Sequence, residues 1–140
     1  MMDDNRMAVV GDALSEMFGP PIDVYTRSEA IEDGVLVDVS ETAKEAGIEY
    51  PVALTRCVWD QYVTPDERSR PLGQSESGRL WDVLQLYRFA ARRSSGGSKM
   101  SFGLYFIMKR NQKRFIVLKA TVGPGDNAEP VITIMLPEED

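Results

Sequence analysis

The chain has 140 residues, of which 43% are hydrophobic and 27% charged, and its formal net charge is −6. These values are typical of a single globular domain over residues 1–140 and exclude a disordered or fibrous chain. One cysteine and no histidine rule out an internal disulfide, an ordinary zinc site, and the Ser-His-Asp and Cys-His catalytic arrangements.

The sequence also predicts the cellular compartment, because it lacks the features of membrane and secreted proteins. The apolar runs are far shorter than the ~20 residues that cross a bilayer, and the acidic start of the chain, Met1 to Arg6, is unlike a secretory signal. A single cysteine suits a reducing compartment. We therefore expect a cytoplasmic protein that binds no membrane.

Helices are predicted where apolar residues recur at helical spacing between start and stop signals. Thr26 and Glu29 form a capping box, and Ser40 is predicted to cap the N-terminus of the helix that begins at Glu41. Residues 64–77, with two prolines and a glycine, are predicted to form a surface loop. The predicted helices cover residues 5–18, 26–34, 41–46, 55–63 and, as the clearest of them, about 80–91.

Strands are predicted where apolar and polar residues alternate. Val35 to Val39 is one such strand, and a brief strand that enters the next helix is also expected at Tyr50 to Ala53. Three further strands follow the last helix, at residues 100–108, 116–122 and 132–136. A type II turn with Gly125 at positive φ is predicted between the last two. The expected fold is α+β, with N-terminal helices packed on a C-terminal three-stranded antiparallel meander.

Charge is strongly segregated along the chain. Residues 1–50 carry 12 acidic and 3 basic side chains, whereas residues 76–115 carry 2 acidic and 9 basic ones. The charges can be solvated or can complement each other within the fold. Alternatively, the acidic half offers a partner-binding surface to a basic protein. The residues predicted for that surface are Asp23, Glu29, Glu32, Asp33, Asp38, Glu41 and Glu45.

The basic residues allow a third interpretation, in which they contact the phosphates of a nucleic acid beside a stacking aromatic ring, Tyr105. Low overall basicity makes nucleic acid the weaker choice of partner. The residues predicted for phosphate contact are Arg88, Arg92, Arg93, Lys109, Arg110, Lys113 and Arg114.

Few residues point to chemistry. Cys57 lies on a predicted amphipathic helix, where a buried and inert thiol is expected. The acidic C-terminus, Glu138 to Asp140, is expected to be a frayed tail rather than a cation site. Tyr25, Arg27 and Glu29 are the polar group that a small nucleotide-using transferase of ADP-ribosyl type would employ. We predict no catalytic residue, no metal and no cofactor.

Four segments carry a resemblance to a known family: Tyr25 to Val39, Pro51 to Arg56 with Trp59, Gly78 to Leu84, and Glu129 to Pro137. On these motifs the chain resembles an uncharacterised family of small proteins carried on bacterial plasmids, integrative elements and phages. The resemblance implies no activity and no site residues. It does imply a setting in which small proteins bind and block host defence enzymes, so the sequence predicts a non-enzymatic protein that binds another protein.

Overall fold

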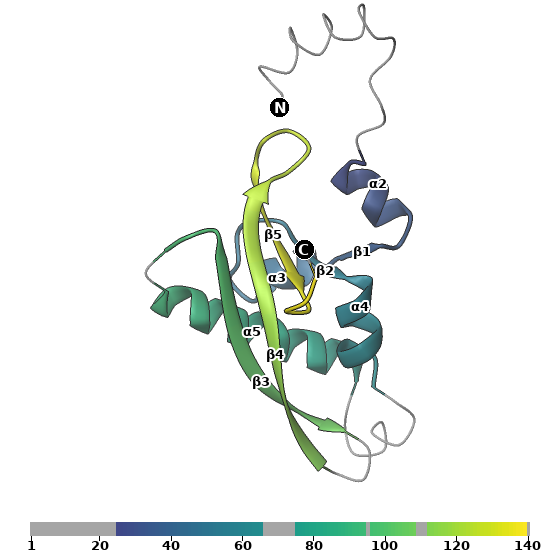
Figure 1. The fold of residues 1–140 in the computed structure, drawn as a ribbon, viewed down its shortest axis with the longest axis vertical. Helices are drawn as coiled ribbons and strands as arrows, with labels where there is room; N and C mark the ends of the chain where they lie inside the picture. Colours follow the sequence, from purple (N-terminus) through teal and green to yellow (C-terminus); the bar gives the residue numbers. More distant parts are fainter. Residues whose placement is uncertain (1–24, 66–74, 95, 109–111, 140) are drawn as a thin grey trace, which may run out of the picture.

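The computed structural model describes residues 25–65, 75–94, 96–108 and 112–139 (Figure 1). The predicted helix over residues 5–18 and most of the predicted loop over residues 64–77 lie outside the described residues.

A five-stranded mixed sheet forms the centre of the described fold. The strands follow the spatial order β1-β2-β5-β4-β3, and neighbours are antiparallel except β2 and β5, which run parallel. The strands are β1 (Leu36–Asp38), β2 (Val52–Thr55), β3 (Lys99–Met108), β4 (Gln112–Pro124) and β5 (Pro130–Met135).

The prediction of a three-stranded antiparallel meander was therefore wrong, although the α+β class and the antiparallel order of β3, β4 and β5 are as expected. The error lies in the two short N-terminal strands, which join the same sheet. Val52, Ala53 and Leu54 of β2 are fully buried on both faces. Such a strand is a short continuous apolar run with no alternation to mark it.

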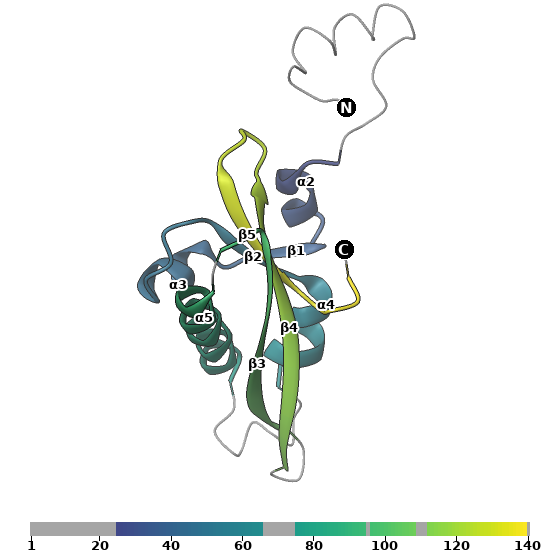
Figure 2. The same cartoon turned by 60° about the vertical axis from the view of Figure 1, so that its left-hand side comes forward.

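The helices cover the two faces of the sheet unequally. α3 (Ser40–Glu45) and α5 (Glu76–Arg93) lie on one face, and α2 (Arg27–Glu32) and the short α4 (Arg56–Val58) lie on the other (Figure 2). The π-helix η1 (Trp59–Val63) directly continues α4. β3 and β4 extend past the other strands as a long ribbon (Figure 1).

The core lies between α5 and the sheet. Alternate residues of β4 (Ile116, Leu118, Ala120) are buried against the helix stripe, and the ring of Tyr87 packs edge-on against Phe102. The predicted stripe of the clearest helix is confirmed, since Leu80, Val83, Leu84 and Tyr87 are all buried. This layer fixes the position of β3 relative to α5.

Of the two predicted helix N-caps, the structure contains one. The capping box is confirmed, because the Thr26 hydroxyl accepts from the amide of Glu29 and the Glu29 carboxylate accepts from the amide of Thr26. Ser40 is not the N-cap that we predicted: Val39 occupies that position, and the Ser40 hydroxyl instead donates to Asp38 and accepts from the amide of Val52. Ser40 thus links α3 to β2.

The predicted helix over residues 55–63 exists, but its second half is a π-helix. A π-turn contains one more residue than an α-turn. Val63, five residues after Val58, is therefore fully buried. Tyr62, which α-helical spacing from Val58 would place on the buried face, is half-buried.

The turn between β4 and β5 also differs from the prediction. Gly125 is not at positive φ; Ala128 is, with φ of 67°. The turn closes through hydrogen bonds from the Gly125 amide to the Glu129 carbonyl and from the Ala128 amide to the Gly125 carbonyl. The left-handed conformation costs roughly 1–2 kcal/mol for a residue with a Cβ.

A buried arginine joins three elements at the N-terminal end of α5. Arg79 is 2% exposed, and its guanidinium donates to the carbonyls of Tyr62 (2.8 Å) and Ile107. The guanidinium carbon also lies 5.1 Å from the ring centre of Phe106. One side chain thereby ties α5 to η1 and to the outer edge of β3.

We predict that Arg79→Ala lowers the free energy of unfolding by about 2–4 kcal/mol, because two carbonyls lose their donor and a cavity opens. Urea denaturation measures the change. The control is Arg92→Ala, an exposed arginine of the same helix, for which we expect a change within about 0.5 kcal/mol. Equal stabilities of the two variants would contradict the linking role of Arg79.

We also predict that Ala128→Gly raises the free energy of unfolding by about 1 kcal/mol, because glycine adopts positive φ without strain. Gly34, at φ of 82°, provides the reverse test, and Gly34→Ala should lower stability by about 1–2 kcal/mol. Thermal denaturation of both variants checks the pair, and the prediction fails if the two midpoints shift in the same direction.

Candidate functional site

The acidic residues predicted for partner binding gather on α2, β1 and α3. Three of their carboxylates have structural partners: Glu29 in the capping box, Asp33 as acceptor from the Tyr25 hydroxyl (2.8 Å), and Asp38 as acceptor from Ser40. Asp23 lies outside the described residues. The other three predicted residues, Glu32, Glu41 and Glu45, are exposed.

A groove about 280 Å³ in volume lies between α2, the start of α3 and the β4–β5 turn. We call it the acidic groove, because four of its lining residues are carboxylates: Glu32, Asp38, Asp126 and Glu129. Each of these four residues is exposed. Glu41 continues the same negative surface from Asp38 along α3.

The sequence analysis does not predict Asp126 and Glu129 as site residues. Both lie after the basic segment, in the stretch that is predicted to form a turn. The structure gives Asp126 a definite role: its carboxylate accepts from the amides of Arg27 (2.9 Å) and Ser28 (3.0 Å) in the first turn of α2. An aspartate that caps a helix from a distant loop leaves no local motif. This contact holds the β4–β5 turn beside α2 and forms the groove.

One cation lines the acidic groove. Arg27 is half-buried, and its guanidinium donates to the hydroxyl of Thr133 (2.8 Å) and to the carbonyl of Ile132 (2.9 Å). Burial lowers the pKa of Arg27 from its ordinary value, while the nearby carboxylates, Asp38 first, act in the opposite direction. Arginine stays charged under such shifts, so four carboxylates face one guanidinium and the groove is net negative.

Three of the ten residues that line the groove are apolar. Ile31 is half-buried, Val131 is buried, and Pro51 lies beside them. A lysine or arginine side chain has the matching character, with an aliphatic stem and a cationic end. The groove therefore has the chemistry to accept a basic side chain of a partner.

The predicted basic residues do not form one surface. Lys109 and Arg110 lie outside the described residues. Arg88, Arg92 and Arg93 lie in the last turns of α5, and Arg88 lies beside Gly47. Arg114 instead pairs with Phe106, which contacts Arg79 in the first turns of the helix.

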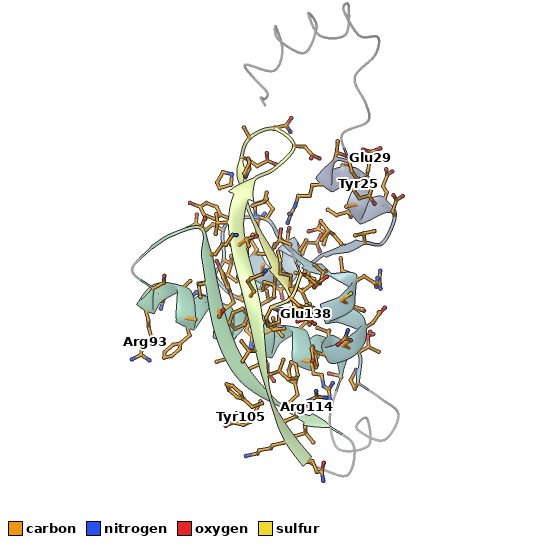
Figure 3. The ribbon with its side chains drawn as sticks, in the orientation of Figure 1. Tyr25, Glu29, Arg93, Tyr105, Arg114 and Glu138 are labelled. Carbon is orange, nitrogen blue, oxygen red and sulfur yellow. The ribbon has the colours of Figure 1, made fainter. Side chains whose placement is uncertain are left out.

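Lys113 neighbours Arg114 on β4. Since Arg88 to Arg93 lie 9 to 14 residues after Arg79, the two parts of the basic set lie about 14–21 Å apart along α5 at ~1.5 Å per residue. Figure 3 shows Arg93 and Arg114 well separated. The ring of Tyr105 packs against Phe115, with 5.0 Å between ring centres. It does not lie beside the arginines of α5.

No ion pair joins the acidic set to the basic set within the parts of the chain that the structure describes. The structure does contain an ion pair on α4 and η1, between Arg56 and Asp60 at 3.6 Å. Within the described residues, the acidic set and the basic set therefore do not pair with each other.

A larger cavity of about 730 Å³ lies on the same side of the sheet, between α2, α4 and the C-terminus. Cys57 lines it and is exposed, so the expectation of a buried thiol was wrong. The carboxylate of Glu139 raises the pKa of this thiol. A thiol beside a carboxylate is a poor nucleophile, because the reactive thiolate is disfavoured.

The C-terminal residues are also better ordered than expected. Glu139 accepts from the Thr55 hydroxyl (2.7 Å) and from the Leu136 amide (2.8 Å), and its carbonyl accepts from the ammonium of Lys119. The prediction of a frayed end was wrong at this residue. The C-terminus closes one side of the larger cavity.

The three residues considered for a transferase have separate structural tasks. Tyr25 donates to Asp33, Glu29 completes the capping box, and Arg27 is directed at the sheet. Figure 3 shows Glu29 on α2 and Tyr25 close to it, just before the helix begins. The arrangement does not aim these side chains at a common point where a nucleotide would react.

The described residues contain neither a metal-binding cluster nor a membrane-spanning helix. No cluster of three or more histidine, cysteine, aspartate or glutamate side chains with the geometry of a metal site occurs among them. None of the helices built from these residues has the length and apolar character that crossing a bilayer requires.

Comparisons with known proteins give one match. Neither the curated proteins nor the solved structures include one that matches the chain. A family model described as a family of unknown function (DUF6573) matches residues 18–140, which include all four segments of the resemblance noted in the sequence. The chain therefore belongs to the family of unknown function DUF6573.

Proposed function

We propose that this protein acts by binding another protein, with the acidic groove and the adjacent carboxylates of α3 as its binding surface for a basic segment. The observation that carries the proposal is the convergence of Glu32, Asp38, Asp126 and Glu129 from three separate parts of the chain. None of the basic residues that the structure describes in the predicted phosphate-contact set forms an ion pair with them. Burying a lysine or arginine stem against Ile31 and Val131 adds apolar contact to the charge attraction.

The partner that we propose is a protein with a surface rich in lysine and arginine, such as a nucleic-acid-binding enzyme of the host. The resemblance to proteins of mobile elements supports this choice, because such proteins gain from blocking host defence. An acidic protein that covers the basic surface of such an enzyme competes directly with nucleic acid. Inhibition therefore requires no chemistry from the chain itself.

We predict that the protein binds a fluorescently labelled peptide of alternating lysine and leucine, measured by anisotropy at low salt. The double variant E32K/E41K should weaken binding about tenfold, because two attractive charges become repulsive. Both residues are exposed and neither makes a side-chain hydrogen bond that the fold needs. Raising the salt should weaken binding of the wild type, since the contact is electrostatic.

The matched control is E49K/E138K, which changes the net charge by the same amount at exposed positions outside the groove. We expect this variant to bind within about twofold of wild type. If both double variants lose binding equally, attraction to overall negative charge replaces the groove as the explanation. If the wild type does not bind the peptide at low salt, the proposed function is wrong.

A calorimetric titration with NAD and with ATP separates binding from enzymatic function. A binding protein of the proposed kind gives no heat with either nucleotide, whereas a nucleotide-using transferase does. Saturable heat that R27A abolishes would favour the transferase. Because Arg27 also holds α2 against the sheet, the titration requires a thermal denaturation curve to show that R27A is folded.

A further inference from the structure

β3 is a ten-residue strand at the edge of the sheet, and it pairs only with β4 among the strands that the structure describes. The Val122 amide donates to the Ser98 carbonyl, so the even-numbered residues of β3 direct their backbone groups toward β4. The backbone groups of Lys99, Ser101, Gly103 and Tyr105 consequently point outward. Arg79, which donates to the Ile107 carbonyl, confirms that odd-numbered carbonyls face the outer edge.

Apolar side chains gather on both sides of this edge. Six of the nine large exposed apolar residues of the described chain belong to α5, β3 and β4, and all of these except Trp81 lie around this edge. A long apolar edge strand is a template for another strand, and natural proteins usually cover or charge it. The five residues are Leu86, Phe89, Tyr105, Phe115 and Val117.

The flank of α5 beside this edge carries a second, independent pattern. Asp82, Leu86, Phe89 and Arg93 follow the spacing i, i+4, i+7, i+11, which keeps them on one narrow face of the helix. All four are exposed. The stripe reads acidic, apolar, apolar, basic, so it complements itself when two copies run antiparallel.

The pattern on α5 and the pattern on β3 each define the position of a twofold axis, and the two positions agree. An antiparallel pair of α5 helices places Leu86 against Phe89 and Asp82 against Arg93 across a twofold axis between residues 86 and 89. A twofold axis on β3 that uses the outward residues Ser101, Gly103 and Tyr105 lies at Gly103. It leaves Ile107, whose carbonyl accepts from Arg79, outside the paired residues. Leu86, Phe89 and Gly103 line one cavity of about 550 Å³ between the helix and the edge, so one axis serves both elements.

Gly103 suits the position on the axis. The ring of Phe115 lies over it, so closely that a Cβ at residue 103 would lie 2.3 Å from Phe115 Cζ. A glycine within a strand often marks a close approach by another backbone. With Gly103 opposite its own counterpart, Ser101 lies opposite Tyr105, and the aromatic pairs of Tyr105 and Phe115 from both copies become one continuous surface.

We propose that the protein forms a symmetric homodimer in which β3 pairs antiparallel with β3 of a second copy about Gly103, and the Asp82–Arg93 flanks of the two α5 helices pack together. The interface is isologous, as closed twofold symmetry requires. It joins two five-stranded sheets into one of ten strands. The proposal is independent of the acidic groove, which is lined by Asp38 of β1, the strand at the other edge of the sheet.

The test is sedimentation velocity of the full chain from low micromolar concentration to about 200 µM. We expect the wild type to sediment as a dimer. D82K and R93E should each weaken dimerisation about tenfold, because each places like charges together twice per dimer. The double variant D82K/R93E should return to within about threefold of wild type, because the reversed charges attract again.

Ser101→Pro tests the strand pairing separately. It removes an amide that points outward and makes no bond to β4, so the variant should remain folded but lose the dimer. The matched control is Tyr50→Ala, an exposed aromatic residue away from β3, which should dimerise like wild type. Circular dichroism verifies that each variant is folded; if S101P is not, Ser101→Lys provides the same test with the amide retained but a charge added beside Tyr105 of the second copy.

A wild type that stays monomeric at the highest concentration overturns the proposal and leaves the edge to a strand of a different protein. A dimer that all of these variants leave unchanged also overturns it, since the contact then lies elsewhere. Failure of D82K/R93E to recover while D82K and R93E each weaken the dimer overturns the antiparallel helix contact.

Discussion

Parallel pairing of β2 with β5 joins the two halves of this chain. β2 follows α3, and β5 is the last strand, so the pairing closes a loop of about 80 residues and carries a large entropic cost. Complete burial of Val52, Ala53 and Leu54 offsets that cost. β1 pairs with β2, and α3 is linked to β2 through Ser40. α2 reaches the sheet through Asp126 of the β4–β5 turn and through Arg27, which donates to Ile132 and Thr133 of β5. The acidic groove exists because this pairing brings Asp38 close to Asp126.

The two edges of the sheet are protected in different ways. β1 is three residues long and ends in Asp38, and short charged edges resist pairing with other chains. β3 is ten residues long and pairs with β4 alone among the strands that the structure describes. Its outward residues include small and aromatic ones, and its outward carbonyl at Ile107 accepts from Arg79. The contrast assigns distinct roles to the edges: the β1 side presents charge, and the β3 side presents backbone and apolar surface.

Sequence patterns predicted most of the elements but not their assembly. The capping box at Thr26 and the stripe of α5 were readable because they are local. The sequence predicts a brief strand at Tyr50 to Ala53 but not its place in the sheet, because a strand buried on both faces does not alternate. The same limit applies to the site: Glu32 and Asp38 were named from their charge, whereas Asp126 and Glu129 reach the groove through a contact almost 100 residues distant in sequence. Val63 is buried because η1 is a π-helix, and the α-helical spacing of apolar residues does not predict a π-helix.

Separation of the two surfaces has a consequence for binding strength. The acidic groove lies on the β1 side and the dimer edge on the β3 side, with three strands between those edges. A dimer through β3 therefore holds two grooves at its two ends, facing away from the interface. A partner that displays repeated basic segments, or that is itself a dimer, can engage both grooves, and the second contact then forms at high effective concentration. A groove that holds a single basic side chain weakly in one protomer can in this way support tight binding by the pair.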